Sequence, residues 1–240
     1  MQIYVKSAGF SINQDYTWVD NTGNKADIDL SVLSYNVDGV KFVWKSTDTA
    51  VYIFANGFVA KDRVDLYNRP LRNYVCLEGK TEEAKSMYQC FAKMLLDQKN
   101  FENMLNSNIR NTKDDSNIGF FVDFEKIYSF FDSPLPDDKK TCRLRRYLYE
   151  NDSFEARKDL LNELFGVRRK PLTLFVGGDL SGERLKALSP DRALLNHIDR
   201  ESLASNKCKP HIPFKSAAIA LGAVTLSASI LVLMMKRDEK

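Results

Sequence analysis

The sequence predicts an α+β domain followed by one transmembrane helix, and three observations support this prediction. Hydrophobic and polar residues alternate over much of the first 78 positions, and from residue 80 the hydrophobic period becomes helical. Residues 216–235 then form a run of 20 residues without a charge, the length at which a helix crosses the hydrocarbon core of a bilayer. We therefore divide the chain into an α+β domain (1–205), a basic juxtamembrane linker (206–215), a transmembrane helix (216–235) and a short tail (236–240).

Strand signals dominate the first 78 residues, where we expect a mainly antiparallel sheet. Residues 1–6 and 28–32 alternate between hydrophobic and polar, and residues 74–77 form another short strand-like run. The dipeptides Asp38-Gly39 and Asn56-Gly57 each lie between two apolar runs. Because these residue types tolerate positive φ, each dipeptide predicts a two-residue β-hairpin.

The clearest helix of the domain is expected just after residue 80. Thr81 can cap it, and two glutamates follow in its first turn. Its hydrophobic residues recur at helical spacing and mark one continuous face: Ala84, Met87, Tyr88, Phe91, Met94 and Leu95. We interpret this face as core packing.

The remaining elements of the domain follow from shorter signals. Helices are expected at four places: residues 100–109, after Asp123, residues 138–149, and after the possible capping box Asp152-Ser153-Phe154-Glu155. Residues 118–122 and 172–176 predict strands. Ser189-Pro190-Asp191 predicts the start of the last helix before the linker, with proline at its first position.

The chargeless segment 216–235 is expected to make this a single-pass, tail-anchored membrane protein. Three Lys or Arg lie on each side of it, so the positive-inside rule does not orient the helix. The first 14 residues lack the charged start and apolar stretch of a signal peptide, and we therefore expect the large domain in the cytoplasm.

Small residues share one face of this segment: Ala218, Gly222, Thr225 and Ser229. Such a helix–helix seam lets backbones approach closely and indicates a homo-oligomer. The alternative is a plain single-span anchor.

Composition and motifs argue against catalysis. A net charge of +3 does not by itself indicate a nucleic-acid-binding domain, and four cysteines without CxxC spacing fit a reducing compartment. His197 and His211 have no Cys, His or carboxylate at metal-ligand spacing, and no nucleophile motif accompanies them. We predict no catalytic residue, no metal and no cofactor, and hence a protein that is not an enzyme.

A glycine-rich loop, residues 177–182, follows a predicted strand and leads into a possible helix. Glycines and a helix N-terminus suit a phosphate, but the loop lacks the Walker lysine and the GxGxxG spacing. We favour an ordinary strand-to-helix turn. A membrane-tethered enzyme that uses this loop remains the third hypothesis for function.

Basic residues are concentrated between positions 139 and 170, with ten Lys or Arg against five acids. The candidate ligand-binding residues are Lys139, Arg143, Arg146, Tyr147, Arg168 and Arg169. Guanidinium groups pair with phosphates and aromatic rings stack on bases, so one hypothesis is a nucleotide or oligonucleotide ligand. Anionic lipid headgroups and an ordinary solvated face are the alternatives.

A polar run at residues 61–73 contains Arg63, Asp65, Arg69 and Arg72 between apolar strands. Paired Arg and Asp side chains often tie a loop to a sheet, so we expect a structural network here, with a ligand or subunit contact as the alternative. The run Arg63 to Asn73, followed by a strand, resembles a pattern in uncharacterised bacterial membrane-anchored effectors of phage-defence and other conflict systems.

This resemblance implies a cytoplasmic sensing domain at the bacterial inner membrane that oligomerises in response to a signal and then depolarises the membrane. We accordingly expect an effector in antiphage defence whose domain binds a protein partner or an anionic ligand and whose oligomers perturb the lipid bilayer. The alternative is a non-catalytic membrane adaptor that presents a protein-binding domain.

Overall fold

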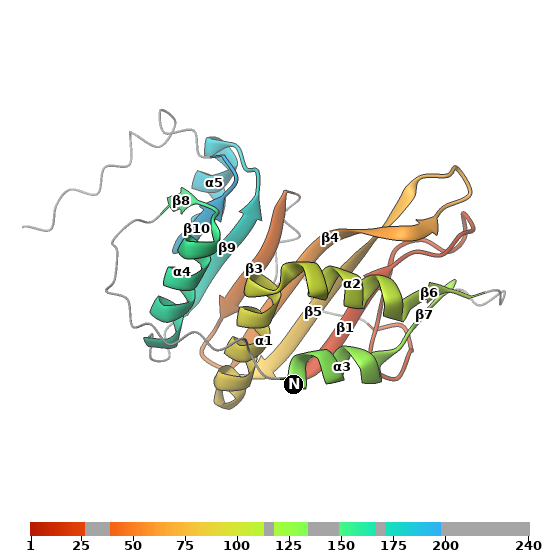
Figure 1. Cartoon of the computed structure of the whole chain (residues 1–240), viewed down its shortest axis with the longest axis horizontal. Helices are drawn as coiled ribbons and strands as arrows, with labels where there is room; N and C mark the ends of the chain where they lie inside the picture. The colour runs from red at the N-terminus through yellow and green to blue at the C-terminus, as the bar shows by residue number, and fades with distance from the viewer. Residues whose placement is uncertain (27–38, 113–117, 134–148, 167–170, 198–240) are drawn as a thin grey trace, which may run out of the picture. The chain divides into compact units, whose positions relative to one another are not determined.

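The computed structural model describes residues 1–26, 39–112, 118–133, 149–166 and 171–197 (Figure 1). Contacts divide the chain into two units, Met1–Asp199 and Arg200–Lys240, and every described residue belongs to the first. The predicted linker and transmembrane helix lie outside the described residues. Within the described part of the chain, no helix is both long enough and apolar enough to cross a membrane.

The fold is α+β, as predicted, and is built on a large mixed sheet. Among the described residues, eight strands form this sheet in the order β2-β1-β5-β4-β3-β9-β10-β8. Neighbouring strands are antiparallel from β2 through β9, and β9, β10 and β8 are parallel. The strands are β1 (Gln2–Ser7), β2 (Thr17–Val19), β3 (Val40–Ser46), β4 (Ala50–Val64), β5 (Pro70–Lys80), β8 (Tyr149–Asn151), β9 (Leu172–Gly178) and β10 (Arg192–Leu195).

Helices cover one face of the antiparallel part of the sheet (Figure 1). A 3-10 turn at Thr81–Glu83 leads into the first helix, and a small separate pair, β6 (Ile109–Asn111) and β7 (Phe120–Val122), lies between the second and third. The helices are α1 (Ala84–Leu96), α2 (Gln98–Asn108), α3 (Phe124–Asp132), α4 (Phe154–Gly166) and α5 (Gly182–Leu188). Asp123 caps α3 as expected, since its Oδ1 accepts the Lys126 N–H at 3.2 Å.

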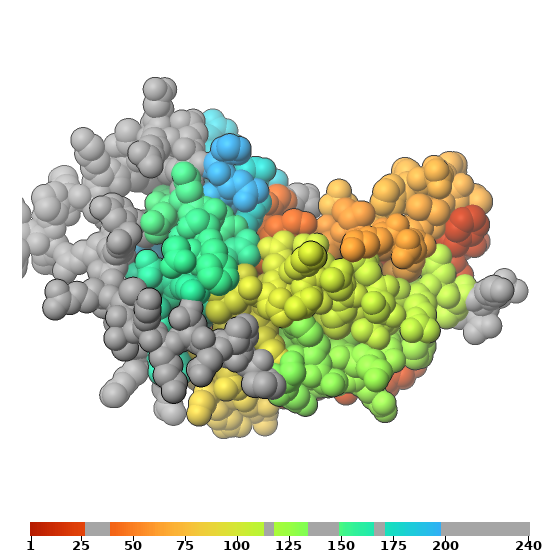
Figure 2. Space-filling view, viewed as in Figure 1, coloured from red at the N-terminus to blue at the C-terminus, as the bar shows by residue number. Residues whose placement is uncertain are grey.

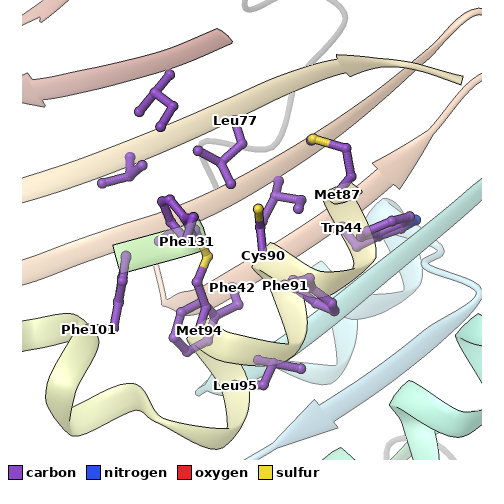
Figure 3. Close-up of a cluster of buried hydrophobic side chains, with 14 of the residues drawn as sticks. Phe42, Trp44, Leu77, Met87, Cys90, Phe91, Met94, Leu95, Phe101 and Phe131 are labelled. Atoms are coloured by element: carbon purple, nitrogen blue, oxygen red, sulfur yellow. The ribbon is translucent and has the colours of Figure 1, made fainter. Parts of the chain in front are cut away.

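The core lies between α1 and the sheet (Figure 3). The predicted apolar face of α1 is confirmed, because Met87, Phe91 and Met94 are completely buried. Phe91 packs against the Trp44 ring of β3, with centroids 5.5 Å apart. Burial of large apolar side chains of this kind is the main source of stability, and truncating one to alanine typically costs about 2–5 kcal/mol.

Lys93, a buried lysine of α1, joins this helix to α3. Its Nζ donates hydrogen bonds to the Phe130 and Phe131 carbonyls and to Ser133 Oγ, at the C-terminal end of α3. A cation at this end satisfies free carbonyls and interacts favourably with the helix dipole. Burial lowers the pKa of Lys93 below its ordinary value.

The hairpin predicted at Asn56-Gly57 is wrong, because β4 runs straight through these residues. Pairing with β5 shifts register between Ala55 and Phe58, and Gly57 has a φ of +66°. The dipeptide therefore forms a β-bulge, which uses the same tolerance of positive φ as a hairpin turn. The chain reverses instead at residues 47–49. Of the Asp38-Gly39 hairpin, only Gly39 and the strand after it lie within the described residues.

The helix predicted after Ser189 is also wrong, since residues 192–195 form strand β10 and the helix, α5, precedes Ser189. Asp191 determines this outcome: its N–H donates to the Thr173 carbonyl and its carboxylate accepts the Thr173 N–H, at 2.9 and 2.8 Å. These bonds align the following residues with β9. A short, continuously buried apolar run is typical of such a parallel strand.

Two further boundaries differ from the sequence prediction. The helix expected over 138–149 falls mostly outside the described residues, and its last predicted residue, Tyr149, begins strand β8. Before α4, the capping residue is Ser153, whose Oγ accepts the Ala156 N–H at 3.1 Å. Because Ala156 then occupies the third helical position, Glu155 does not complete a capping box.

Candidate functional site

A group of exposed hydrophobic side chains lies where the β4–β5 hairpin meets the loop after β1. Nine large hydrophobic side chains are exposed among the described residues, and five of them gather here. We call these five the hairpin-end patch: Phe10, Ile12, Tyr16, Leu66 and Tyr67. Figure 2 shows the tip of the hairpin (orange) beside part of the N-terminal segment (red). Clustered rather than scattered exposure marks a binding surface.

The tip of the hairpin is held by a single carboxylate. Asp65 Oδ1 accepts the N–H groups of Tyr67 and Arg69, each at 2.9 Å, and its Oδ2 receives the Arg69 guanidinium at 2.7 Å. Asn68 adopts a φ of 60° to close the turn. Partial burial works against ionisation of Asp65, but the hydrogen bonds from Arg69 and Tyr67 prevail and lower its pKa. The tip is therefore preorganised.

Arg63 anchors the base of the hairpin from inside. It is only 6% exposed, and its guanidinium donates to Asn111 Oδ1 (2.7 Å), Ser7 Oγ (2.9 Å), Asn73 Oδ1 (3.1 Å) and the Ala8 carbonyl (2.6 Å). Within the described part of the chain, all of these acceptors are neutral and Arg63 has no carboxylate partner. Burial lowers the pKa of Arg63 to about 10, so the side chain still carries its charge at neutral pH.

The loop after β1 is fixed to the hairpin by hydrogen bonds from two backbone N–H groups of the hairpin. The Leu66 N–H donates to the Phe10 carbonyl, and the Arg72 N–H donates to the Tyr16 hydroxyl, both at 2.9 Å. The Arg72 side chain is exposed and bonds to the Gly57 carbonyl at 3.1 Å. Together with the tip and Arg63, these contacts hold two segments about 56 positions apart in one rigid surface.

The structure thus brings together part of the predicted polar network. Asp65 and Arg69 form an ion pair, whereas Arg63 and Arg72 bond to other groups. The hydrophobic residues of the patch were missed by sequence reasoning, although apolar side chains inside turn-rich segments are a signal for such a surface. The other candidates lie outside the described residues: Lys139, Arg143, Arg146, Tyr147, Arg168, Arg169, Ala218, Gly222, Thr225 and Ser229.

The glycine-rich loop packs closely against strand β3. Gly177 and Gly178 have φ values of +72° and +92°, and a Cβ on Gly178 would collide with the Gly39 carbonyl oxygen. Ser181 caps α5, and its Oγ accepts the Arg184 N–H at 3.2 Å. These contacts explain the glycines by backbone conformation and close approach, as in the strand-to-helix turn favoured from the sequence.

Reactive groups do not converge on the patch. The described residues contain no group of three or more His, Cys, Asp or Glu side chains placed to hold a metal ion. The thiols of Cys76 and Cys90 are buried in the core, and burial raises the pKa of Cys90 to about 12. A rigid, apolar, exposed surface is suited to binding another macromolecule.

Comparison with known proteins adds no relative: no protein-family model, no curated protein and no solved structure matches the chain. Its function therefore has to be inferred from its own residues.

Proposed function

We propose that the protein is a single-span membrane effector that self-associates on the bilayer through the hairpin-end patch. In this proposal residues 216–235 span the membrane, the domain lies on the cytoplasmic side, and assembly brings the spans together so that they perturb the bilayer. The observation that carries the proposal is the preorganised, exposed patch formed by Phe10, Ile12, Tyr16, Leu66 and Tyr67.

The size of the patch explains why assembly would depend on the membrane. Burying a large apolar side chain from full exposure contributes about 1.5–3 kcal/mol, so the five partly exposed side chains of the patch contribute at most on the order of 8–15 kcal/mol. Association in solution costs on the order of 4–15 kcal/mol in lost freedom, which leaves little net affinity. Anchoring copies in one membrane raises their effective concentration and removes much of this cost.

The sequence of the predicted transmembrane helix also supports a second copy of this chain as the partner. Ala218, Gly222, Thr225 and Ser229 recur at helical spacing, so a second copy of this chain could meet it both in the bilayer and at the patch. A role at the bacterial inner membrane in antiphage defence is supported by the resemblance of residues 63–73 alone. An anionic ligand, such as a nucleotide or oligonucleotide held by residues 139–169, would be the signal that triggers assembly.

A non-catalytic adaptor is the second candidate, because the same patch would suit a different protein. Aromatic residues such as Tyr67 are enriched at the centres of protein interfaces, where they bury a large area with few rotatable bonds. The two candidates predict different complexes. An adaptor binds one stoichiometric partner while its full-length chain stays monomeric, whereas an effector forms an oligomer of the chain itself.

The test replaces Leu66 and Tyr67 by serine in the full-length protein and measures cross-linked oligomers in membranes, together with growth of the expressing cells. We expect oligomers and growth inhibition to fall several-fold. Phe154→Ser is the matched control, since Phe154 is exposed to 52% but lies on α4 outside the patch. Unchanged oligomers in the double variant would contradict the proposal. A monomeric wild type that retains one other protein through the patch would favour the adaptor.

A further inference from the structure

A cavity of about 260 Å³ lies at the start of β4, the opposite end of this strand from the hairpin-end patch. Its walls come from β3, β4, α1, α4 and β9, and its large apolar lining residues are Trp44, Val51, Tyr88, Leu164, Phe165 and Leu172. We call it the Trp44 cavity. By comparison with a dry cavity of about 150 Å³ that holds benzene, it has room for about ten non-hydrogen atoms.

The indole nitrogen of Trp44 is a buried donor without an acceptor. Trp44 is only 4% exposed, and its Nε1 has no hydrogen-bond partner in the described structure. Figure 3 shows this nitrogen on the side of the ring turned away from Phe91 and Met87. A buried tryptophan N–H normally finds a partner, and leaving it unpaired costs stability. Less than 1 Å² of this nitrogen is accessible, so an acceptor on a ligand reaches it only after a small shift of the ring, and would then remove this cost.

Two other polar groups near the cavity, in contrast to the Trp44 N–H, do have hydrogen-bond partners. Thr47 Oγ1 is bonded to the Ala50 backbone, and Thr81 Oγ1 donates to the Asp48 carbonyl at 3.1 Å. Both hydroxyls serve turns and are already occupied. The hydrogen-bond donors available to a ligand in the cavity are therefore other groups than these two hydroxyls.

Two further donors line the cavity. Neither the Tyr88 hydroxyl nor the Lys85 ammonium has a hydrogen-bond or ion-pair partner among the residues that the structure describes, and Lys85 is exposed, at the mouth. Burial raises the pKa of Tyr88, so its hydroxyl remains a donor at neutral pH. Among the residues that the structure describes, no aspartate or glutamate lines the cavity. The cavity thus offers donors and one positive charge to an apolar guest.

We propose that the Trp44 cavity binds a small apolar carboxylate. The apolar body lies between Tyr88 and Leu164, the carboxylate accepts from Trp44 Nε1, and Lys85 balances its charge. A carboxylate accepts hydrogen bonds from these donors and also balances the positive charge of Lys85. A neutral ligand of the same shape can accept the hydrogen bonds but leaves the charge unbalanced, and a cationic ligand is repelled by Lys85. This site is independent of the hairpin-end patch.

Phenylacetate, with ten non-hydrogen atoms, is a suitable probe. In full-length Trp18→Phe protein in lipid nanodiscs, Trp44 is the only tryptophan, so its fluorescence reports the cavity. We expect a saturable change with phenylacetate, a weaker response to neutral phenylacetamide and none to phenethylamine. Equilibrium dialysis of labelled phenylacetate with the wild type provides the same measurement if the Trp18 variant does not fold.

The variant Lys85→Met separates charge recognition from apolar filling. We expect its affinity for phenylacetate to fall about three- to tenfold while its affinity for phenylacetamide stays the same. Lys99→Met, an exposed lysine of α2 away from the cavity, is the control and should change neither. Absence of saturable phenylacetate binding, equal loss for both probes in Lys85→Met, or binding of phenethylamine would each overturn the proposal.

Discussion

The two ends of strand β4 distribute polar and apolar groups in opposite ways. At the hairpin end the cation of Arg63 is buried with four acceptors, and the large apolar side chains face outward. At the other end the apolar side chains line a cavity, and the Trp44 N–H has no acceptor among the described residues. Where the buried polar groups are hydrogen-bonded and the surface above them is apolar, the surface suits a macromolecular partner. Where a buried donor without an acceptor lies beside a cavity, the cavity suits a small ligand.

The hairpin end is not perfectly satisfied, and the exception is informative. Asn73 Nδ2 is buried without a partner in the described structure, although Asn73 Oδ1 accepts from both Ser7 and Arg63. Asn73 does not line the small cavity at this end, so no ligand could reach it there. An unpaired donor indicates a ligand site only where a cavity adjoins it, and Trp44 meets that condition.

The largest effect is expected from Arg63→Met, which tests whether the network at the hairpin end is structural. The change removes four hydrogen bonds and leaves the buried Ala8 carbonyl without its donor, whereas Asn73 Oδ1 keeps the bond from Ser7 and Asn111 is exposed to water, so the cost should be about 3 kcal/mol. The thermal unfolding midpoint should fall by about 10 °C. Arg72→Met is the control: its side chain is exposed with one bond to Gly57, so the midpoint should stay nearly constant. A small effect of Arg63→Met would show that the network contributes little.

A smaller effect is expected at the cavity end from Trp44→Phe. The lost ring contacts should cost about 1–2 kcal/mol, because phenylalanine keeps part of the packing and the unpaired N–H disappears. Chemical unfolding of the full-length protein measures the difference. A loss as large as that of Arg63→Met would mean that the indole N–H is satisfied in solution.

These two sites also show what the sequence could and could not predict. The face of α1 was predictable because Met87, Phe91 and Met94 recur at helical spacing, and strand β1 because its hydrophobic and polar residues alternate. The partners of Arg63 were not, since Ser7 and Asn111 lie far from it in the chain and only the fold brings them together. For the same reason, Phe10 and Leu66 could not be recognised as one surface.

Predictions from local sequence were wrong where a residue type suits two local structures and contacts elsewhere in the fold selected the other one. Gly57 tolerates positive φ in a bulge as well as in a hairpin, and pairing with β5 on both sides favoured the bulge. Pro190 could begin a helix, but the bonds between Asp191 and Thr173 formed a strand instead. The ligand site proposed at the Trp44 cavity depends on an N–H without a partner among the described residues, which no sequence pattern reveals.

Acid should weaken the hairpin end before the cavity end. The pKa of Asp65 is lowered from its ordinary value of 3.8, so its contribution to stability is complete above that value and is lost as the pH falls through the lower, folded value. Between pH 6 and pH 3 the unfolding midpoint should therefore fall more in the wild type than in Asp65→Asn. Equal slopes would indicate that Asp65 does not fix the tip, while the titration of its carboxyl by NMR would give the pKa directly.

The smallest effect is expected from substitutions of Asn68, which test whether the patch needs a rigid tip. Asn68 has a φ of 60°, which alanine adopts with strain and glycine without it, so Asn68→Ala should cost about 0.5–1 kcal/mol and Asn68→Gly almost nothing. Glycine, however, leaves the tip more flexible before binding. If preorganisation drives assembly, both variants should form fewer cross-linked oligomers, although only the alanine variant is less stable. If oligomers instead follow stability alone, the patch acts through its hydrophobic area and not through the rigidity of the turn.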